Sequence, residues 1–425
     1  MPTIVIAGGG IAGLEALAAL RAHLGSDVRI ELLEAATDLV ERQRAVAAPF
    51  DGTAPRRFDL AKIAADHDAH LRPDRLATVD TDARRVRTVR GDTVPYDALL
   101  VAVGAKPDIA IPGSLTFSGP RDVAAYARLL ADLRDGRVSR VAFALPSAAT
   151  WALPLYELAL MTAEHLDAAG RRDAGLVIVT PEHTPLEAFG ERIASHMWSL
   201  LAERAIAVRA DTVPLRAGPG GLVVAGGTRV QVERIVALPR LGGPWIGGLP
   251  CDEQGFLATD EHAAVEGVDA VWAAGDGTSF PIKQGGIAAQ QADAAARAIA
   301  ASLGADVVAE PFRPVLRGLL LDPRGRRFLD STRGDMPATP LWWPPTKVVA
   351  PHLGRYLFPG SPPTPPEHDE HVDVGQLLLN MASRHIASGE LITALRCLEA
   401  ARQVLGELPP DAAARRSEIL GRVAV

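Results

Sequence analysis

A glycine-rich turn near the N-terminus constrains the fold more than any other feature of the chain. Gly8, Gly10 and Gly13 have the spacing Gly-x-Gly-x-x-Gly, and they follow a short apolar run at residues 3–7. That run has the length and composition of a buried strand, and the residues that follow the glycines in the sequence have helical composition. A second buried strand is predicted at residues 28–33. Strand, turn, helix and strand within about 30 residues predict a βαβ unit with a parallel sheet.

The spacing of the glycines gives each of them a physical role. Gly8 permits the tight turn, Gly10 lets the backbone approach a pyrophosphate, and Gly13 allows close packing of helix on strand. The helix N-terminus offers free N–H groups and the positive end of the helix dipole. Glu34 ends the second strand, where its carboxylate can accept hydrogen bonds from ribose hydroxyls. A glycine-rich turn without a ligand is the alternative, but strand, helix and acid in register favour a dinucleotide site.

The same pattern returns in the middle of the chain without its glycines. A strand is predicted at residues 140–145, a helix at 150–166 and a strand at 175–179. The turn between the first strand and the helix reads LPSAATW (residues 145–151). Every Cβ there takes space that a pyrophosphate would need, and the proline also lacks an N–H donor. Glu182, behind the second strand, could meet a ribose, but we expect a solvated loop acid.

Composition and cysteine content exclude several classes of protein. The 425 residues carry a formal net charge of −7, which argues against nucleic acid as the main partner. Cys251 and Cys397 are the only cysteines, and they lie far apart without metal-ligand spacing. The N-terminus reads as part of the fold and not as a signal peptide, and no apolar stretch is long enough to span a membrane. We therefore expect a cytoplasmic protein with no metal site.

Two further segments resemble motifs of a known family. Residues 98–107 (ALLVAVGAKP) resemble the ATG segment of two-dinucleotide-binding flavoproteins, and residues 270–276 (AVWAAGD) resemble their second FAD motif. Over roughly residues 3–320 the chain resembles the FAD-dependent pyridine nucleotide-disulfide oxidoreductase superfamily. It is most similar to the branch of sulfide:quinone oxidoreductases and type II NADH dehydrogenases. The resemblance implies an α/β fold with two Rossmann-like (two-dinucleotide-binding) domains.

The resemblance, together with shifts in composition, divides the chain into several parts. We expect a split FAD-binding domain at residues 1–120 and 245–320, with a second Rossmann-like domain between its halves, at residues 121–244, that carries the degenerate NAD(P) turn. An interface segment (321–358), a proline-rich linker (359–373) and a helical tail (374–425) follow. Helices are predicted in the tail at 374–387, 390–406 and 410–422. One helical hairpin cannot bury its own apolar face, so we expect the tail to dock within a homodimer. The aromatic residues of segment 341–358 suit a membrane interface or a contact between subunits.

The resemblance also implies the residues that contact FAD. Asp276 would bond the ribityl chain, and Lys283 is a candidate for tuning the flavin, with a plain surface lysine as the alternative. Gln284 and the backbone up to Ile287 could bond the flavin ring. The complete candidate set is Gly8, Gly10, Ile11, Ala12, Gly13, Glu34, Arg42, Val79, Ala102, Gly104, Gly275, Asp276, Lys283, Gln284 and Ile287.

These features predict an FAD-dependent oxidoreductase with a non-covalent flavin. The degenerate turn disfavours NAD(P)H as donor, and the absence of a cysteine pair disfavours a redox disulfide. A small molecule or a protein would supply the electrons, and a quinone or a protein would accept them. Two alternatives stay open: an NAD(P)H dehydrogenase of type II-like character, and a flavin-binding interaction protein with decayed catalysis. Peripheral contact with the inner face of the membrane also stays open.

Overall fold

The first α/β unit is built on a five-stranded parallel sheet. The computed structural model describes residues 1–425 except 148–149, 332, 343, 359–373 and 424–425. The strand order is β20-β9-β1-β2-β5, with bounds Val271–Ala273, Ala98–Val101, Thr3–Ala7, Arg29–Leu33 and Ala69–Arg72. Ile4, Val5 and Ile6 are completely buried, as expected for a parallel strand covered on both faces. β20 comes from a part of the chain far from the others in sequence, so this unit is split.

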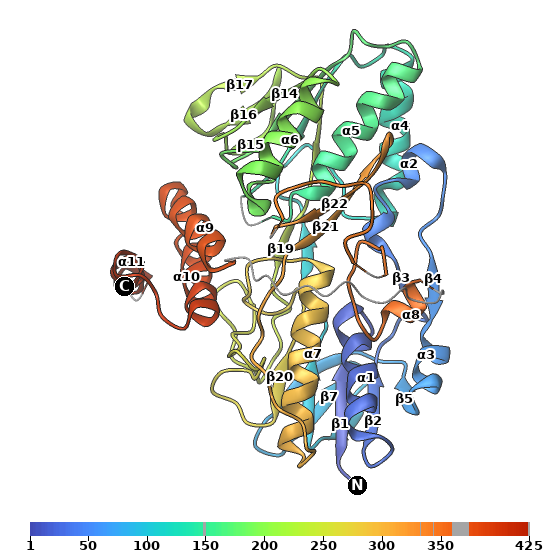
Figure 1. Ribbon diagram of the computed structural model, residues 1–425, viewed down its shortest axis with the longest axis vertical. Helices are drawn as coiled ribbons and strands as arrows, with labels where there is room; N and C mark the ends of the chain where they lie inside the picture. The colour runs from blue at the N-terminus through green and yellow to red at the C-terminus, as the bar shows by residue number, and fades with distance from the viewer. Residues whose placement is uncertain (148–149, 332, 343, 359–373, 424–425) are drawn as a thin grey trace.

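Helices α1 (Ile11–Leu24) and α7 (Gly285–Ser302) lie side by side against this sheet (Figure 1). Both are rich in alanine, which lets their backbones approach each other and the strands closely. Smaller elements complete the unit: β3 (Asp38–Val40), α2 (Ala48–Asp51), β4 (Arg57–Asp59), α3 (Leu60–Asp66), and the antiparallel sheet of β6 (Leu76–Asp80), β7 (Arg85–Thr88) and β8 (Thr93–Pro95).

The second α/β unit repeats this architecture. Its parallel sheet has the order β11-β18-β12-β13-β14, with bounds Leu115–Thr116, Arg234–Ala237, Arg140–Ala144, Gly175–Val179 and Ile206–Arg209. Its helices are α4 (Val123–Arg134), α5 (Leu153–Ala168) and α6 (Glu191–Ala202), and an antiparallel sheet joins β15 (Pro214–Gly218), β16 (Gly221–Val224) and β17 (Arg229–Val230). β10 (Lys106–Asp108) pairs with β19 (Arg240–Gly242), where the chain leaves and re-enters the first unit. The predicted α/β fold of two Rossmann-like units is confirmed.

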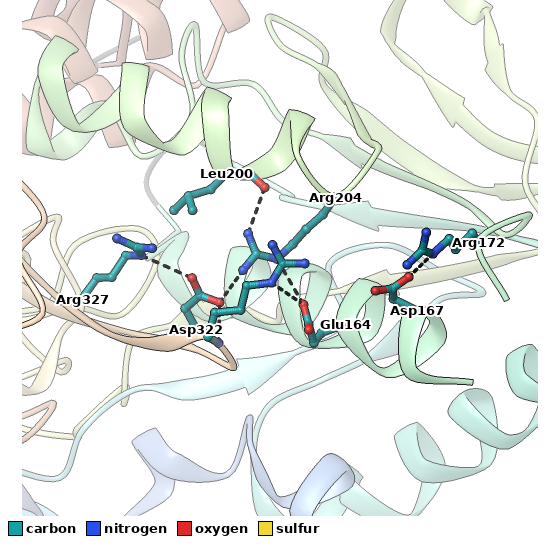
Figure 2. Close-up of polar contacts among 8 residues, drawn as sticks. Glu164, Asp167, Arg172, Leu200, Arg204, Asp322 and Arg327 are labelled. Atoms are coloured by element: carbon teal, nitrogen blue, oxygen red, sulfur yellow. Dashed lines mark hydrogen bonds and ion pairs between the residues drawn. The ribbon is translucent and has the colours of Figure 1, made fainter. Parts of the chain in front are cut away.

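A hairpin of β21 (Arg317–Asp322) and β22 (Gly325–Asp330) fastens the following segment to the second unit. Figure 2 shows the buried pair at its tip, in which Arg204 Nη2 donates to Asp322 Oδ1 at 2.6 Å. Arg327 approaches the other oxygen of Asp322 at 3.3 Å, and Glu164 lies 3.8 Å from Arg204 Nε. The hairpin therefore belongs to the body of the molecule.

The aromatic segment behind this hairpin packs into the body of the chain. Trp342 is 5% exposed, with its ring 4.8 Å from that of Phe328, and its Nε1 donates to Thr346 O at 3.1 Å. The short helix α8 (Gly354–Leu357) carries Tyr356, whose hydroxyl donates to Asp66. The expectation that Trp342 forms part of an exposed interface is therefore wrong, because its partners lie in its own chain. Trp343 lies outside the described residues.

The C-terminal tail folds into α9 (Val374–Ser388), α10 (Leu391–Leu405) and α11 (Pro410–Val423), close to the predicted ranges. The predicted linker 359–373 lies outside the described residues. Figure 1 shows the tail at one side of the molecule, level with the junction of the two units. Part of its apolar face packs on the body of the same chain, because Leu378, Ala394 and Leu398 belong to a core cluster that includes the second unit.

Candidate functional site

The first glycine turn joins β1 to α1 and leaves an open space above its middle glycine. Gly8 has φ +114°, and a Cβ there would lie 2.3 Å from Ala102 O. A Cβ on Gly13 would lie 1.8 Å from Gly8 O, so both glycines are required by the packing of the protein itself. A Cβ on Gly10, in contrast, would meet no heavy atom of the described residues within 4 Å. Packing does not explain Gly10, whereas a phosphate group would fit this space.

Glu34 is held at the end of β2 with its carboxylate next to this turn. Its Oε2 accepts from the Gly9 N–H and its Oε1 from the Ala36 N–H, both at 2.8 Å. These bonds fix the orientation of a half-buried carboxylate, whose remaining lone pairs can accept from hydroxyl groups. Ile11 and Ala12 begin α1 behind the turn, and α1 has no side-chain N-cap. The turn, the helix start and Glu34 thus form one continuous polar edge.

Ala102 and Gly275, two other predicted residues of the first unit, lie against the turn and the start of α1. Ala102 donates its N–H to Ala7 O at 2.7 Å, and Gly104 follows with φ +71°. A Cβ on Gly275 would approach the Ala12 side chain to 3.2 Å, so α1 and the β20–α7 connection are in close contact. Val79 lies in the core of the unit, and its N–H donates to Gly247 O at 2.8 Å.

Asp276 and Lys283 bring opposite charges to the segment between β20 and α7. Burial raises the pKa of the Asp276 carboxyl, while the positive charges of Lys283 and Arg42 oppose this shift. Lys283 is half-buried, with its Nζ 4.2 Å from the centre of the Phe256 ring and bonded to Thr278 O. Burial lowers the pKa of Lys283 to about 7, against the attraction of Asp276. The alternative of a plain surface lysine is wrong, because Lys283 lies inside the site.

Gln284 and Ile287 are engaged with each other at the start of α7. Gln284 Oε1 accepts from the Ile287 N–H, and its Nε2 donates to Arg317 O, both at 2.8 Å. The side chain of Gln284 is therefore the N-cap of α7. Direct bonds to a ring from this side chain would compete with the cap.

A cavity of about 860 Å³ opens beside this segment. Three parts of the chain surround it: the loop with Arg42 and Gln43, the degenerate turn with Trp151, and the first turn of α10. Lys283 and Phe256 also line it. Its walls are mainly apolar with a few charged side chains, as in many sites for small molecules.

The second turn, between β12 and α5, is covered by the tail. Ser147 Oγ donates to Glu390 Oε2 at 3.3 Å, and Glu390 also binds His385 Nδ1 at 2.9 Å. A carboxylate from the tail therefore lies at the turn that would hold a second pyrophosphate. Residues 148–149 of this turn lie outside the described residues.

Glu182 is buried and not solvated, contrary to expectation. It is 4% exposed, and its Oε2 accepts from Tyr156 Oη at 2.7 Å and from Thr180 Oγ1 at 2.9 Å. Burial raises the pKa of Glu182 to about 7. Leu377 and Met381 of α9 close the small space next to it. The acid that could meet a second ribose is thus sealed inside the protein.

The cysteines form no pair. Cys251 is half-buried and Cys397 is completely buried, and both are free. Burial raises the pKa of the Cys397 thiol to about 12, which keeps it protonated. Within the described part of the chain, no group of three or more His, Cys, Asp or Glu side chains could hold a metal ion. The helices in that part are also too short or too polar to cross a membrane.

The tail residues of the cavity were missed from the sequence. Arg396 lines it and binds Asp252 at 2.6 Å, and Glu390 lies at the second turn. Neither residue belongs to a motif. Only the amphipathic pattern of the tail indicated that this segment docks on something, and it did not indicate where.

The chain has two units, each built on a parallel sheet, and the first has an intact glycine turn with an acid at the end of the next strand. These features define a dinucleotide-binding oxidoreductase. The chain belongs to the pyridine nucleotide-disulphide oxidoreductase family, whose model matches residues 2–298. Members of this family are flavin-dependent oxidoreductases, and the chain is an enzyme of this class.

Individual relatives support this assignment. A Mycobacterium tuberculosis protein described as NADH dehydrogenase-like is 26% identical over 309 residues, which span 65% of this chain and 72% of that protein. The sulfide:quinone oxidoreductase of Aquifex aeolicus has a TM-score of 0.69 at 19% identity, over 77% of this chain and 83% of that one. A ferredoxin reductase of Rhodopseudomonas palustris has a TM-score of 0.60 at 17% identity, over 77% and 82% of the two chains. The two solved structures show the shared fold.

Proposed function

We propose that this enzyme passes electrons through a non-covalently bound FAD from a donor other than NAD(P)H to a quinone or a protein acceptor. The observation that carries the proposal is the contrast between the two turns. The turn at Gly8–Gly13 keeps an open cradle, whereas the second turn has lost its glycines and lies against Glu390. This contrast supports one dinucleotide site in the chain and not two.

The residues of the first unit suit the parts of FAD. The N–H groups at the start of α1 would bind the pyrophosphate above Gly10, and Glu34 would accept from the ribose hydroxyls. Asp276 would hold the ribityl chain. When bound, the flavin ring supplies reversible two-electron chemistry. Lys283 would provide a positive charge near the ring, and we propose that residues 1–120 and 245–320 form this domain.

The proposal predicts that NADH and NADPH do not reduce the flavin. In an anaerobic titration of the purified holoenzyme, we expect no bleaching of flavin absorbance at micromolar to millimolar nucleotide. Dithionite should bleach the same sample, which shows that the flavin is competent. Rapid bleaching by either nucleotide would overturn the proposal and favour the type II NADH dehydrogenase-like alternative, which the description of the mycobacterial relative supports.

A second prediction concerns Lys283 and pH. Lys283→Met should lower the reduction potential of bound flavin at pH 6, because a cation near the ring stabilises reduced, anionic flavin. Since burial lowers the pKa of Lys283 to about 7, less of the lysine is charged at pH 9, and the difference should be smaller there. Lys62→Met, at an exposed pair with Asp66, is the matched control. Equal potentials for wild type and Lys283→Met at pH 6 would contradict this role.

The same lysine predicts a pH dependence of stability. Its pKa in the folded protein lies below that of a free lysine, so between about pH 7 and 10 the unfolded chain binds more protons. The stability contributed at this site therefore rises with pH across that range. Urea unfolding of wild type and Lys283→Met at pH 7 and 9 checks this, and the variant should lose part of the rise.

We further propose that the enzyme is a cytoplasmic homodimer. It would contact a membrane peripherally when its acceptor is a membrane quinone. Analytical ultracentrifugation tests the dimer, and co-sedimentation with lipid vesicles tests the membrane contact.

A further inference from the structure

The tail seals the groove in which a second dinucleotide would lie. On α9, Leu377 and Met381 face Trp151 and Glu182 across a space of only about 30 Å³, enough for about one water molecule. Arg384 of the same helix forms an ion pair with Glu187. These contacts close the adenosine end of the groove with side chains of the chain itself.

The next helix closes the side of the large cavity that a nicotinamide would occupy in a nucleotide-dependent relative. Leu391, Ile392 and Arg396, from the first turns of α10, line the cavity. Two contacts anchor the helix to the first unit: Arg396 Nε donates to Asp252 at 2.6 Å, and Gln403 Nε2 donates to Thr259 O at 2.5 Å. The tail is therefore a fixed wall of the cavity.

More cationic than acidic side chains line the cavity, and some of them already have partners within the chain. The cations are Arg42, Arg240, Lys283 and Arg396, and the acids are Glu253 and Glu390. Glu390 is already engaged by His385 and Ser147, and the hydrogen bond to His385 lowers the pKa of Glu390, with a smaller contribution from the charge of Arg240. Arg396 is paired with Asp252, and Lys283 lies close to Asp276, so the excess of positive charge at the cavity comes mainly from Arg42 and Arg240. This excess favours an anionic ligand.

Arg396 provides the second, independent indication of a ligand. Its side chain is only 10% exposed, and its guanidinium lies 4.5 Å from the centre of the Phe256 ring. Asp252 occupies the Nε side, but the buried Nη2 has no hydrogen-bond partner among the described residues. A buried donor without a partner is costly. Because Arg396 lines the cavity, a rotation of its guanidinium would bring this donor to an acceptor on a ligand.

We propose that the tail-lined cavity binds the enzyme's small-molecule substrate as a ring-sized apolar organic anion, with its acidic group at Arg396 and Arg240. The inference rests on the proposed function, because it names the substrate class of the same site. The apolar body packs against Trp151, Leu391 and Ile392. The tail thereby determines specificity: it fills the nucleotide groove and supplies the binding wall in its place.

Calorimetric titration of the full-length holoenzyme with 2-naphthoate and with 2-naphthamide tests this inference. The two probes share size and ring, and only the first is charged. We expect 2-naphthoate to bind at least about tenfold more tightly, as a charge-assisted bond to arginine would give. Arg240→Met and Arg396→Met should each reduce this ratio, whereas Arg402→Met, on the same helix but paired with Glu399, should not. Equal binding of the two probes, or an unchanged ratio in both variants, would overturn the inference.

Arg240 provides a second test if Arg396→Met loosens the tail. Arg240 is exposed and belongs to β19, so its substitution keeps the two anchors of α10, Arg396–Asp252 and Gln403–Thr259. A second pair of variants tests the wall itself. Ile392→Trp should weaken binding of 2-naphthoate by filling the cavity, and Leu405→Trp, at an exposed position on α10, should not. Identical binding in these two variants would also count against the inference.

A separate experiment, reoxidation of the reduced flavin, tests the proposed function. Photochemically reduced holoenzyme is mixed anaerobically with menadione, which takes two electrons and two protons to become its hydroquinone. Failure of this reoxidation, and of reoxidation by protein acceptors, would overturn the proposed function without changing the calorimetric result. Normal reoxidation with no preference for 2-naphthoate would overturn the inference alone.

Discussion

Gly10→Ala should purify as a folded protein that has lost its flavin. The backbone of Gly10 has φ −82°, which alanine adopts freely, and the new Cβ would meet no described atom within 4 Å. The stability of the apoprotein should therefore stay unchanged. A bound pyrophosphate, however, would need the space of that Cβ. Loss of two charge-assisted hydrogen bonds to phosphate corresponds to a weakening of FAD binding by about 100-fold or more.

The comparison with Gly13→Ala makes this prediction specific. A Cβ on Gly13 would lie 1.8 Å from Gly8 O, so this variant should lower the melting temperature of the apoprotein as well. Gly421→Ala, in α11, has open space around it and serves as the control: its flavin content should stay unchanged and its stability should not fall, since alanine favours a helix over glycine. The measurements are the ratio of absorbance at 450 and 280 nm, a titration of apoprotein with FAD, and thermal unfolding. Wild-type flavin content in Gly10→Ala would refute the proposed position of the pyrophosphate.

The first unit could be predicted from the sequence because its signals are local. Gly8, Gly10 and Gly13 lie within one turn, and Glu34 ends the next strand, so spacing alone places them together. The strand and helix ranges followed from apolar runs and periodicity for the same reason. Lys283 was singled out by the resemblance to the flavoprotein family, and the structure places it in the cavity.

The second site could not be predicted in the same way. Glu182 follows a strand and looks exposed in the sequence, but the burial of its carboxylate depends on α9, nearly 200 residues later. Ser147 and Glu390 meet only because the tail packs on the second unit. Trp342 looked suited to an exposed interface, but a tertiary contact with Phe328 buries it. Contacts between distant segments leave no periodic trace in either of them.

Lys347→Met should be among the most destabilising single changes in this chain. Lys347 Nζ lies 2.5 Å from Glu157 Oε2, and the two side chains are 8% and 0% exposed. The pair connects the segment that follows β22 in the sequence to α5 of the second unit. Without the lysine, the buried carboxylate would keep only the N–H of Leu321, at 2.8 Å, as its described partner. Loss of one partner from a buried ion pair costs about 3–5 kcal/mol.

The pH dependence separates this effect from a simple loss of packing. Burial raises the pKa of Glu157, while Lys347 opposes that shift, so removal of the lysine raises the pKa further. At pH values between its unfolded and folded pKa, the folded protein then binds more protons than the unfolded chain, and its stability falls as the pH rises. In urea unfolding, Lys347→Met should therefore lose more stability at pH 8 than at pH 5.

Two further variants test the cause. Adding Glu157→Gln to Lys347→Met removes the uncompensated charge, so the double variant should recover part of the stability and lose the extra sensitivity to pH. Lys62→Met breaks an exposed pair, 69% and 38% exposed, and should cost less than about 1 kcal/mol. If Lys347→Met cost no more than Lys62→Met, or lost the same stability at both pH values, the buried pair would not be what holds this segment to the second unit.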